Sequence, residues 1–218
     1  MPVVFVANQE LFIQFSDYSS FTFGDIVNFS SIGKDKFPVR VPFYNVGAGI
    51  ARNCQIEWDN ESVEKACLSL KDKLAEISPN LAGTYHAYNG ILYCYDFESR
   101  DEHLSSIECW GDGSGGISYS VLTDMIQYPY LLPVTMKEPI ETLALSQGLS
   151  ALLIEAVNQE IDSLPTVNME IRYEDMTGKK YSIVYEISFS VSGVSSGSNY
   201  KSALLQVSAH EKKMEADT

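Results

Sequence analysis

Positive charge and histidine are both scarce in this 218-residue sequence. Lys and Arg number 15 against 29 Asp and Glu, so the formal net charge is −14 at pH 7, and there are three His. A protein that binds nucleic acid has to supply a basic footprint for the phosphates, so we expect no nucleic-acid partner. An anionic membrane surface would be repelled for the same reason. Most hydrolase mechanisms also lack the groups they need, because none of the three His stands in a recognisable constellation.

Long apolar runs and cysteine motifs are missing as well. No stretch approaches the roughly 20 residues that cross a bilayer, so we expect no direct membrane insertion by this chain. The N-terminus MPVVFVANQE has neither the basic region nor the long apolar stretch of a signal peptide. The four cysteines, Cys54, Cys67, Cys94 and Cys109, form no CxxC pair and are too few for a disulfide scaffold. We therefore expect reduced thiols, with Cys67 and Cys94 near apolar faces, in a cytoplasmic protein.

The patterning that is present predicts strands. Over residues 166–175 and again over 181–191, every second residue is apolar, which is typical of half-buried strands. Gly178 lies between the two stretches and can supply the positive φ of a short hairpin turn. Asn89-Gly90 predicts a second hairpin, since this dipeptide favours a type I′ turn. Further strands are predicted at 3–7, 11–15, 38–46, 50–58, 105–110, 117–122 and 202–209.

Two segments have helical spacing. The first covers residues 61–77, with Asn60 as its predicted N-cap. Its apolar face holds Val63, Ala66, Cys67, Leu70, Leu74 and Ile77. The second is predicted from Leu145 to Ile161, before Pro165, with Leu149, Leu152, Leu153, Ala156 and Val157 facing inward. Both apolar faces are expected to pack on a sheet, where a helix buries its apolar side.

Negative charge is concentrated in one part of the chain. Residues 57–112 hold 12 acidic and 4 basic side chains, a net of −8. This stretch also breaks the succession of strands with a helix and a hairpin of its own. We therefore predict a single domain over residues 1–218, with an α/β insertion at approximately 59–128 and a disordered tail at 210–218. The acidic surface is expected to be solvated, or else to meet a basic partner.

One cluster has residue types suited to chemistry. Carboxylates and a histidine gather in residues 96–103, and His86 precedes them in the sequence. Such groups form metal and acid–base sites, which makes His86, Asp101 and His103 the weak candidates for metal ligands. The segment is typical of a solvated loop, however. We assign no catalytic residue, no metal site and no cofactor.

Two motifs carry a resemblance to a known architecture. Residues 38–58 contain Asn45, Gly47, Gly49, Ala51 and Asn53 in the spacing N-x-G-x-G-x-A-x-N. This segment resembles the strand–turn–strand of immunoglobulin-like β-sandwich modules in uncharacterised bacterial membrane-associated proteins. Glycines there would let the backbone turn sharply between two strands. A second motif, Y-x-D-x-x-G-x-x-Y, matches Tyr173, Asp175, Gly178 and Tyr181, and is similar to the hairpin that closes many of those modules.

The resemblance implies a fold and a setting. The expected fold is mainly β: an immunoglobulin-like β-sandwich with two packed helices and the α/β insertion. The expected setting is the cytoplasmic side of the inner membrane, reached through a segment absent from this chain.

Three classes of function stay open from the sequence. The preferred one is a non-enzymatic binding or sensory module with a protein partner. Aromatic residues of the insertion, Tyr85, Tyr88, Tyr93, Tyr95 and Trp110, would be its binding residues. The alternatives are a structural or assembly subunit that pairs through a sheet edge and an enzyme with an unfamiliar site near residues 96–103. The sequence leaves the oligomeric state undetermined.

Overall fold

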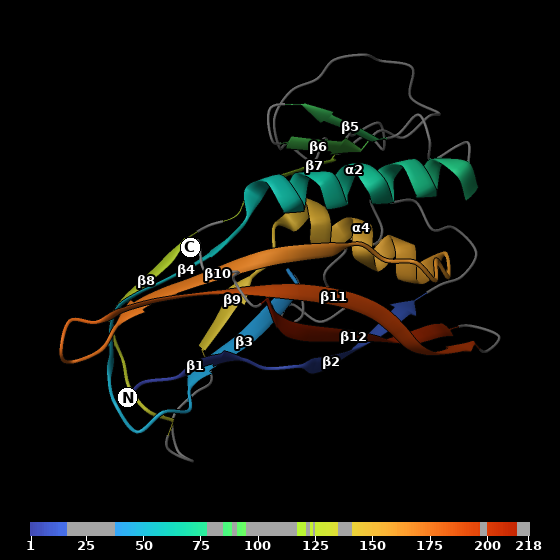
Figure 1. The fold of residues 1–218 in the computed structure, drawn as a ribbon. Helices are drawn as coiled ribbons and strands as arrows, with labels where there is room; N and C mark the ends of the chain where they lie inside the picture. The colour runs from blue at the N-terminus through green and yellow to red at the C-terminus, as the bar shows by residue number, and fades with distance from the viewer. Residues whose placement is uncertain are drawn as a thin grey trace.

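The computed structural model describes residues 1–16, 38–77, 85–88, 91–94, 117–120, 123, 125–134, 141–196 and 200–212 (Figure 1). This part of the chain is mainly β with two helices, which confirms the predicted class. The predicted strand at 105–110 lies outside the described residues.

Antiparallel pairing organises the described strands into three sheets. The large sheet has the order β2-β12-β11-β10-β4-β8, with the strands β2 (Gln9–Ser16), β12 (Tyr200–Lys212), β11 (Lys180–Ser196), β10 (Thr166–Glu174), β4 (Ala51–Trp58) and β8 (Ile126–Leu131). A second sheet consists of β1 (Val4–Val6), β3 (Arg40–Asn45) and β9 (Glu141–Ala144). The third consists of β5 (Tyr85–Tyr88), β6 (Ile91–Cys94) and β7 (Ile117–Ser120).

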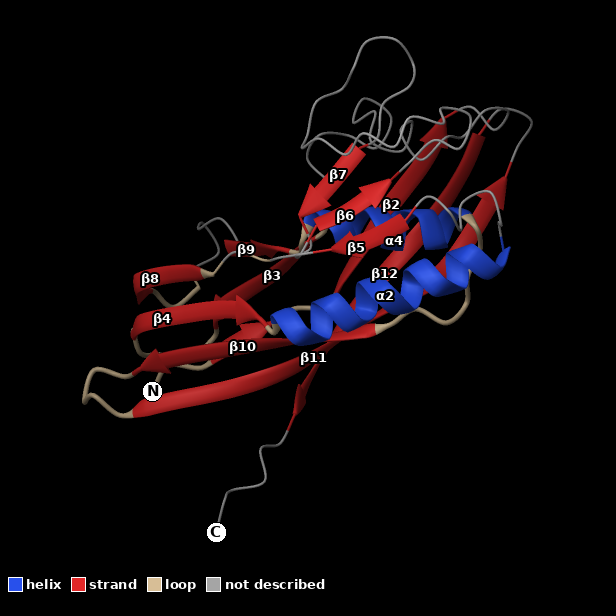
Figure 2. Ribbon diagram, turned by 90° about the horizontal axis from the view of Figure 1, so that it is seen from above, coloured by secondary structure: helices blue, strands red, loops and turns tan. Residues whose placement is uncertain are grey.

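The two helices form a layer between sheets. Helix α2 (Asn60–Ile77) contacts β10 of the large sheet and β5 of the third sheet. Helix α4 (Gln147–Asn158) contacts β12 of the large sheet and β7 of the third. Figures 1 and 2 show this helical layer lying along the long strands. In the chain, α2 and β5–β7 lie between β4 and β8, which are hydrogen-bonded neighbours.

The C-terminal hairpin is confirmed in detail. Strands β10 and β11 pair from Thr166 opposite Ser188 to Glu174 opposite Lys180. The alternating residues Val167, Met169, Ile171, Tyr173, Tyr185, Ile187 and Phe189 are buried. Gly178 has φ +83 in the turn, as a glycine allows. The strand β12 continues to Lys212, so residues 210–212 are not part of a tail, since they pair with β11.

Helix α2 begins directly after β4, and Asp59 caps it. The carbonyl oxygen of Asp59 accepts a hydrogen bond from the Val63 amide at 3.0 Å, and its Oδ1 accepts from the Glu61 amide at 3.1 Å. The prediction of Asn60 as the cap is therefore wrong. Asn60 is already helical, and its Oδ1 accepts from the Thr123 amide instead.

The predicted apolar face of α2 is confirmed except at its end. Val63, Ala66, Cys67, Leu70 and Leu74 are buried. Ile77 is 52% exposed, so its assignment to this face is wrong; it is the last residue of the helix.

Helix α4 is enclosed on every side. It is shorter than predicted and is capped by Ser146, whose hydroxyl accepts from the Leu149 amide at 3.2 Å. Every residue from Gly148 to Val157 is buried, not only the predicted face, because α2, β7 and β12 all pack against the helix. Glu155 is buried with them. Its Oε1 accepts from Gln159, and its Oε2 has no hydrogen-bond partner.

Strands β8 and β9 were not predicted. β8 carries Pro129 and has no regular alternation of burial, and proline is found at edge strands because it lacks a backbone donor. β9 spans only four residues. Both are recognised only through their partners, β4 and β3.

Candidate functional site

Asn45, at the end of β3, holds one end of the molecule together. Its side chain is fully buried and makes four hydrogen bonds. Oδ1 accepts from the amides of Val3 and Gly47, both at 3.0 Å, and Nδ2 donates to the carbonyl oxygens of Gly49 at 2.7 Å and Leu131 at 3.1 Å. A buried amide with all its partners fixes the geometry around it. The N-terminal segment, the β3–β4 turn and the end of β8 are therefore positioned by one side chain.

The glycines of the same turn make room for the N-terminal segment. A Cβ atom at Gly47 would lie 2.4 Å from the backbone oxygen of Met1 and 2.4 Å from the Val3 nitrogen, and one at Gly49 would lie 3.1 Å from the Pro2 nitrogen. Among the described glycines, only Gly178 has a positive φ. The expected reason for Gly47 and Gly49, a sharp turn, is therefore corrected to close backbone approach.

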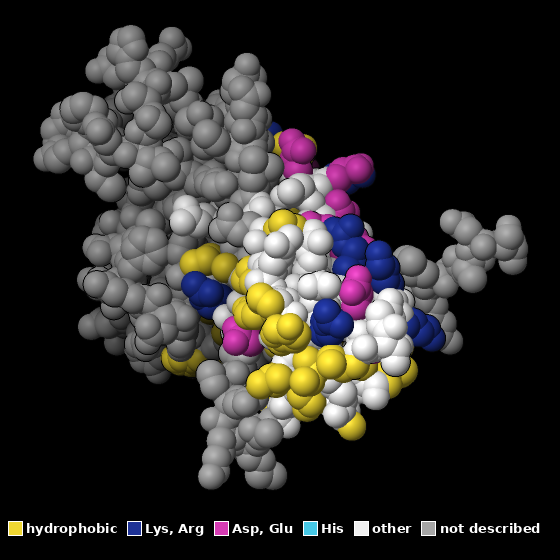
Figure 3. Space-filling view, turned by 90° about the vertical axis from the view of Figure 1, so that its left-hand side faces the viewer, with side chains coloured by type: hydrophobic (Ala, Val, Ile, Leu, Met, Phe, Trp, Pro, Cys, Tyr) yellow, Lys and Arg dark blue, Asp and Glu magenta, His cyan; other side chains and the backbone are white. Residues whose placement is uncertain are grey.

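Exposed apolar residues gather at this end of the molecule. We call them the apolar end surface: Met1, Val3, Phe5, Val46, Tyr130, Leu132 and Val134, each between 38% and 71% exposed. Backbone hydrogen bonds hold three of the segments side by side. The Val46 amide donates to the Val3 oxygen at 2.8 Å, and the Val134 amide donates to the Asn45 oxygen at 2.9 Å. Figure 3 shows apolar side chains clustered over the lower part of this face.

The segments that build the apolar end surface contain no charged side chain. Residues 1–9, 41–51 and 125–134 lack Asp, Glu, Lys and Arg, although 20% of the chain is charged. Arg40 and Arg52 flank the middle segment. The side chains of these segments are therefore uncharged, with Arg40 and Arg52 at their border, and a contact surface is likewise poor in charge at its centre.

Strand β1, below this surface, is apolar on both faces. In β1, Val4 and Val6 are fully buried, whereas Phe5 is 42% exposed and its ring lies 5.7 Å from that of Tyr44 on β3. Antiparallel sheets with one solvated face have polar residues on that face. The outer face of β1 departs from this rule, as expected where another molecule covers it, whereas β3 begins with the exposed Arg40.

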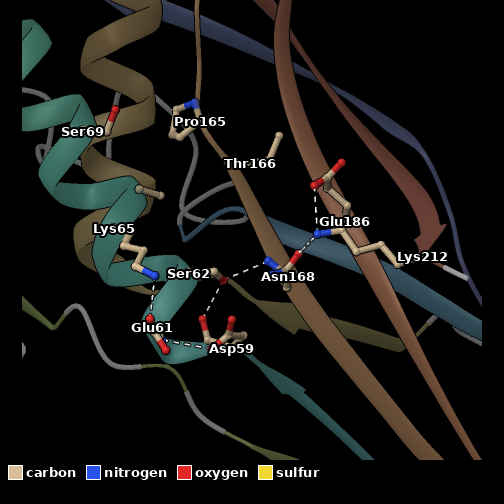
Figure 4. A pocket seen from close by; sticks show the side chains of 11 residues that line it. Asp59, Glu61, Ser62, Lys65, Ser69, Pro165, Thr166, Asn168, Glu186 and Lys212 are labelled. Carbon is tan, nitrogen blue, oxygen red and sulfur yellow. Dashed lines mark hydrogen bonds and ion pairs between the residues drawn. The ribbon is translucent and has the colours of Figure 1, made fainter. Parts of the chain in front are cut away.

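A second feature is a polar groove of about 460 Å³ between α2 and strands β10–β12 (Figure 4). It is lined by Asp59, Glu61, Ser62, Lys65, Ala66, Ser69, Pro165, Thr166, Asn168, Glu186 and Lys212. This groove has the polar groups that a ligand needs but no aromatic residue in its lining.

Both lysines of the polar groove are paired with carboxylates of its lining. Lys65 Nζ lies 2.6 Å from Glu61 Oε1. Lys212 Nζ lies 3.0 Å from Glu186 Oε2 and 2.8 Å from Asn168 Oδ1. The pairing with Glu61 also raises the pKa of Lys65, so this amine stays protonated at neutral pH. Neither lysine of the groove is therefore placed to act as a free nucleophile or a general base.

The predicted metal candidates are only partly placed. His86 lies on β5, with its Cα opposite that of Tyr93 on β6. Asp101 and His103 lie outside the described residues. Within the described part of the chain, no three His, Cys, Asp or Glu residues form a group that could hold a metal ion.

The structure places three of the five predicted aromatic binding residues on strands. Tyr85 and Tyr88 lie on β5 and Tyr93 on β6. Tyr88 pairs with Ile91, and Tyr85 with Cys94. Tyr95 and Trp110 lie outside the described residues.

Sequence reasoning missed the apolar end surface, although two signals were present. The run Val3-Val4-Phe5-Val6 is apolar at every position rather than at every second one, which is typical of a strand covered on both faces. The second signal is the three charge-free segments in an otherwise charged chain. Neither signal shows by itself that the segments lie together, since they are far apart in the sequence.

Comparison with known proteins returned no match: no family model, no curated protein and no solved structure is similar to this chain. No helix in the described residues has the length and apolar character needed to span a membrane.

Proposed function

We propose that this chain is a non-enzymatic binding module that contacts another protein through the apolar end surface. The observation that carries the proposal is the gathering of seven exposed large apolar residues on uncharged segments. Contiguous apolar patches on soluble proteins mark contact surfaces. The pairing of both lysines of the polar groove with carboxylates favours binding over catalysis for the described part of the chain.

The finer fold and the setting belong to the same proposal. An immunoglobulin-like sandwich is supported by the two packed sheets and by the structural roles of Asn45 and Gly178 in the motifs that carry the resemblance. The proposed setting is the cytoplasmic side of a bacterial membrane, reached through a segment absent from this chain. Membrane fractionation of the protein tagged at its native locus tests this setting: a product well above 24 kDa in the membrane pellet supports it, and a 24 kDa soluble product contradicts it.

Site-specific photocrosslinking tests the binding surface. A photoreactive residue is placed at Val46, on the surface, or at Val194, which is 42% exposed on β11 and serves as the control. We expect a discrete adduct from Val46 and none from Val194. The adduct partner is then purified, and its affinity for the Val46→Asp variant is expected to fall at least about tenfold. Equal crosslinking from both positions, or an affinity unchanged by Val46→Asp, would contradict the proposal.

A further inference from the structure

Charge limits which partner suits the apolar end surface. The chain carries a net charge of −14, so a basic partner would be attracted most strongly to the acidic side chains elsewhere on it. The apolar end surface makes no use of that attraction, because its segments have no charged side chain. A surface of this kind suits a partner that carries the same excess of negative charge, since like charges must be kept out of the contact.

The size of the surface also fits this partner. A two-fold contact uses the same patch on both molecules, so the patch has to be complementary to itself. Val3, Phe5 and Val46 bring no like side-chain charges together in such a contact. A standard interface covers about 800 Å² on each partner, of which roughly 57% is apolar. Seven large residues, each at least 38% exposed, supply apolar area of this order.

We infer that the apolar end surface packs against the same surface of a second copy of this chain, forming a two-fold dimer. This inference rests on the proposed function and names its partner. Dimerisation would cover Val3, Phe5 and Val46, which the single chain leaves exposed.

Sedimentation equilibrium of the full chain tests the pairing. We expect a mass close to twice 24.2 kDa for the unmodified chain at concentrations up to about 100 µM. Val46→Asp places two like charges in the contact, and we expect it to weaken association at least tenfold. The control Val194→Asp adds the same charge at an exposed valine on β11 and is expected to leave association unchanged.

The salt dependence of association is a second measurement, and its direction distinguishes this dimer from a contact between opposite charges. Two copies with a net charge of −14 repel each other, and salt screens that repulsion. We therefore expect association to strengthen between about 0.05 M and about 0.5 M NaCl, whereas contact through opposite charges would weaken. Leu132→Ser, at an exposed position after β8, is the second variant if Val46→Asp does not fold, and it should also weaken association.

A chain that stays monomeric at about 100 µM, or a dimer that tolerates both Val46→Asp and Leu132→Ser, would overturn the inference. The proposed function is judged separately. A monomer that still crosslinks another protein from Val46 overturns the dimer alone, while a monomer that crosslinks nothing from Val46 overturns both.

Discussion

The side chain of Asn45 and the backbone of Leu131 are joined by a hydrogen bond of 3.1 Å across 86 residues of sequence. Both groups are buried, and the same amide also reaches the N-terminal segment and the turn before β4. Loss of this one side chain would leave several buried backbone groups without partners, so the first prediction concerns its removal.

Replacing Asn45 with alanine is expected to lower the free energy of unfolding by about 3–5 kcal/mol, because each buried polar group left unpaired costs about 1–3 kcal/mol. Urea denaturation followed by circular dichroism measures the loss. The control is Asn8→Ala, which removes a single exposed hydrogen bond to the Ala209 amide and should cost less than about 1 kcal/mol. Similar losses for the two variants would contradict the assigned role of Asn45.

Gly47→Ala is expected to destabilise the chain by about 1–3 kcal/mol, the usual cost of overpacking. The added Cβ would meet backbone atoms of Met1 and Val3 at 2.4 Å, and backbone cannot give way as a flexible side chain can. Gly193→Ala is the matched control, since no atom lies within 4 Å of its added Cβ. Thermal unfolding of both variants should separate them clearly, and a neutral Gly47→Ala would show that the N-terminal segment does not pack here.

Glu155→Gln is expected to stabilise the protein at neutral and alkaline pH. Burial raises the pKa of the Glu155 carboxyl in the folded state, although Gln159, Asn158 and Lys201 oppose this effect. The folded state therefore favours the protonated acid. Stability from this group is fully present below the unfolded pKa and is lost as pH rises through the folded pKa.

The gain from Glu155→Gln should therefore be measurable at pH 8 and absent near pH 4. Melting temperatures of the unmodified chain and the variant across this range measure it. Glu64→Gln, on the exposed side of α2, is the control and should show no such dependence. A gain that is equal at both pH values would contradict ionisation as the cause.

Asp175→Asn is expected to destabilise the β10–β11 turn at neutral pH. Hydrogen bonds from Thr177, Lys179 and Tyr181 lower the pKa of Asp175 to about 2. A carboxyl with a lowered folded pKa contributes stability above its unfolded pKa, and that contribution is lost as pH falls through the folded value. The difference in melting temperature between the variant and the unmodified chain should therefore shrink between pH 4 and pH 2. A constant difference would show that the charge on Asp175 does not matter.

Cys54 and Cys67 are expected to resist alkylation in the folded protein. Both are free and buried, and burial raises the pKa of each thiol to about 12. Because the thiolate is the reactive form, iodoacetamide at pH 8 should leave both unmodified. Peptide mass spectrometry reports each cysteine separately, and urea-unfolded protein is the positive control. Rapid labelling of Cys67 without denaturant would indicate that α2 opens readily.

Local patterns predicted the features whose causes are local. The alternation from Val167 to Tyr173 matches the strand period, so β10 and its buried face followed from the sequence alone. The turn at Gly178 followed because Asp175 and Gly178 are close in the chain and make their own bonds. The two helices followed from their spacing, although Asp59 rather than Asn60 caps the first.

The sequence by itself determined a mainly β chain with two helices, the C-terminal hairpin and the excess of negative charge, because periodicity and composition need no distant partner. Only the tertiary structure decided that α4 is enclosed on every side, that β8 pairs with β4, and that Val3, Val46 and Val134 lie next to one another. Those features depend on contacts between residues far apart in the chain, such as the bond from Asn45 to Leu131. The charge-free segments were visible in the sequence, but it is folding that joins them into one surface.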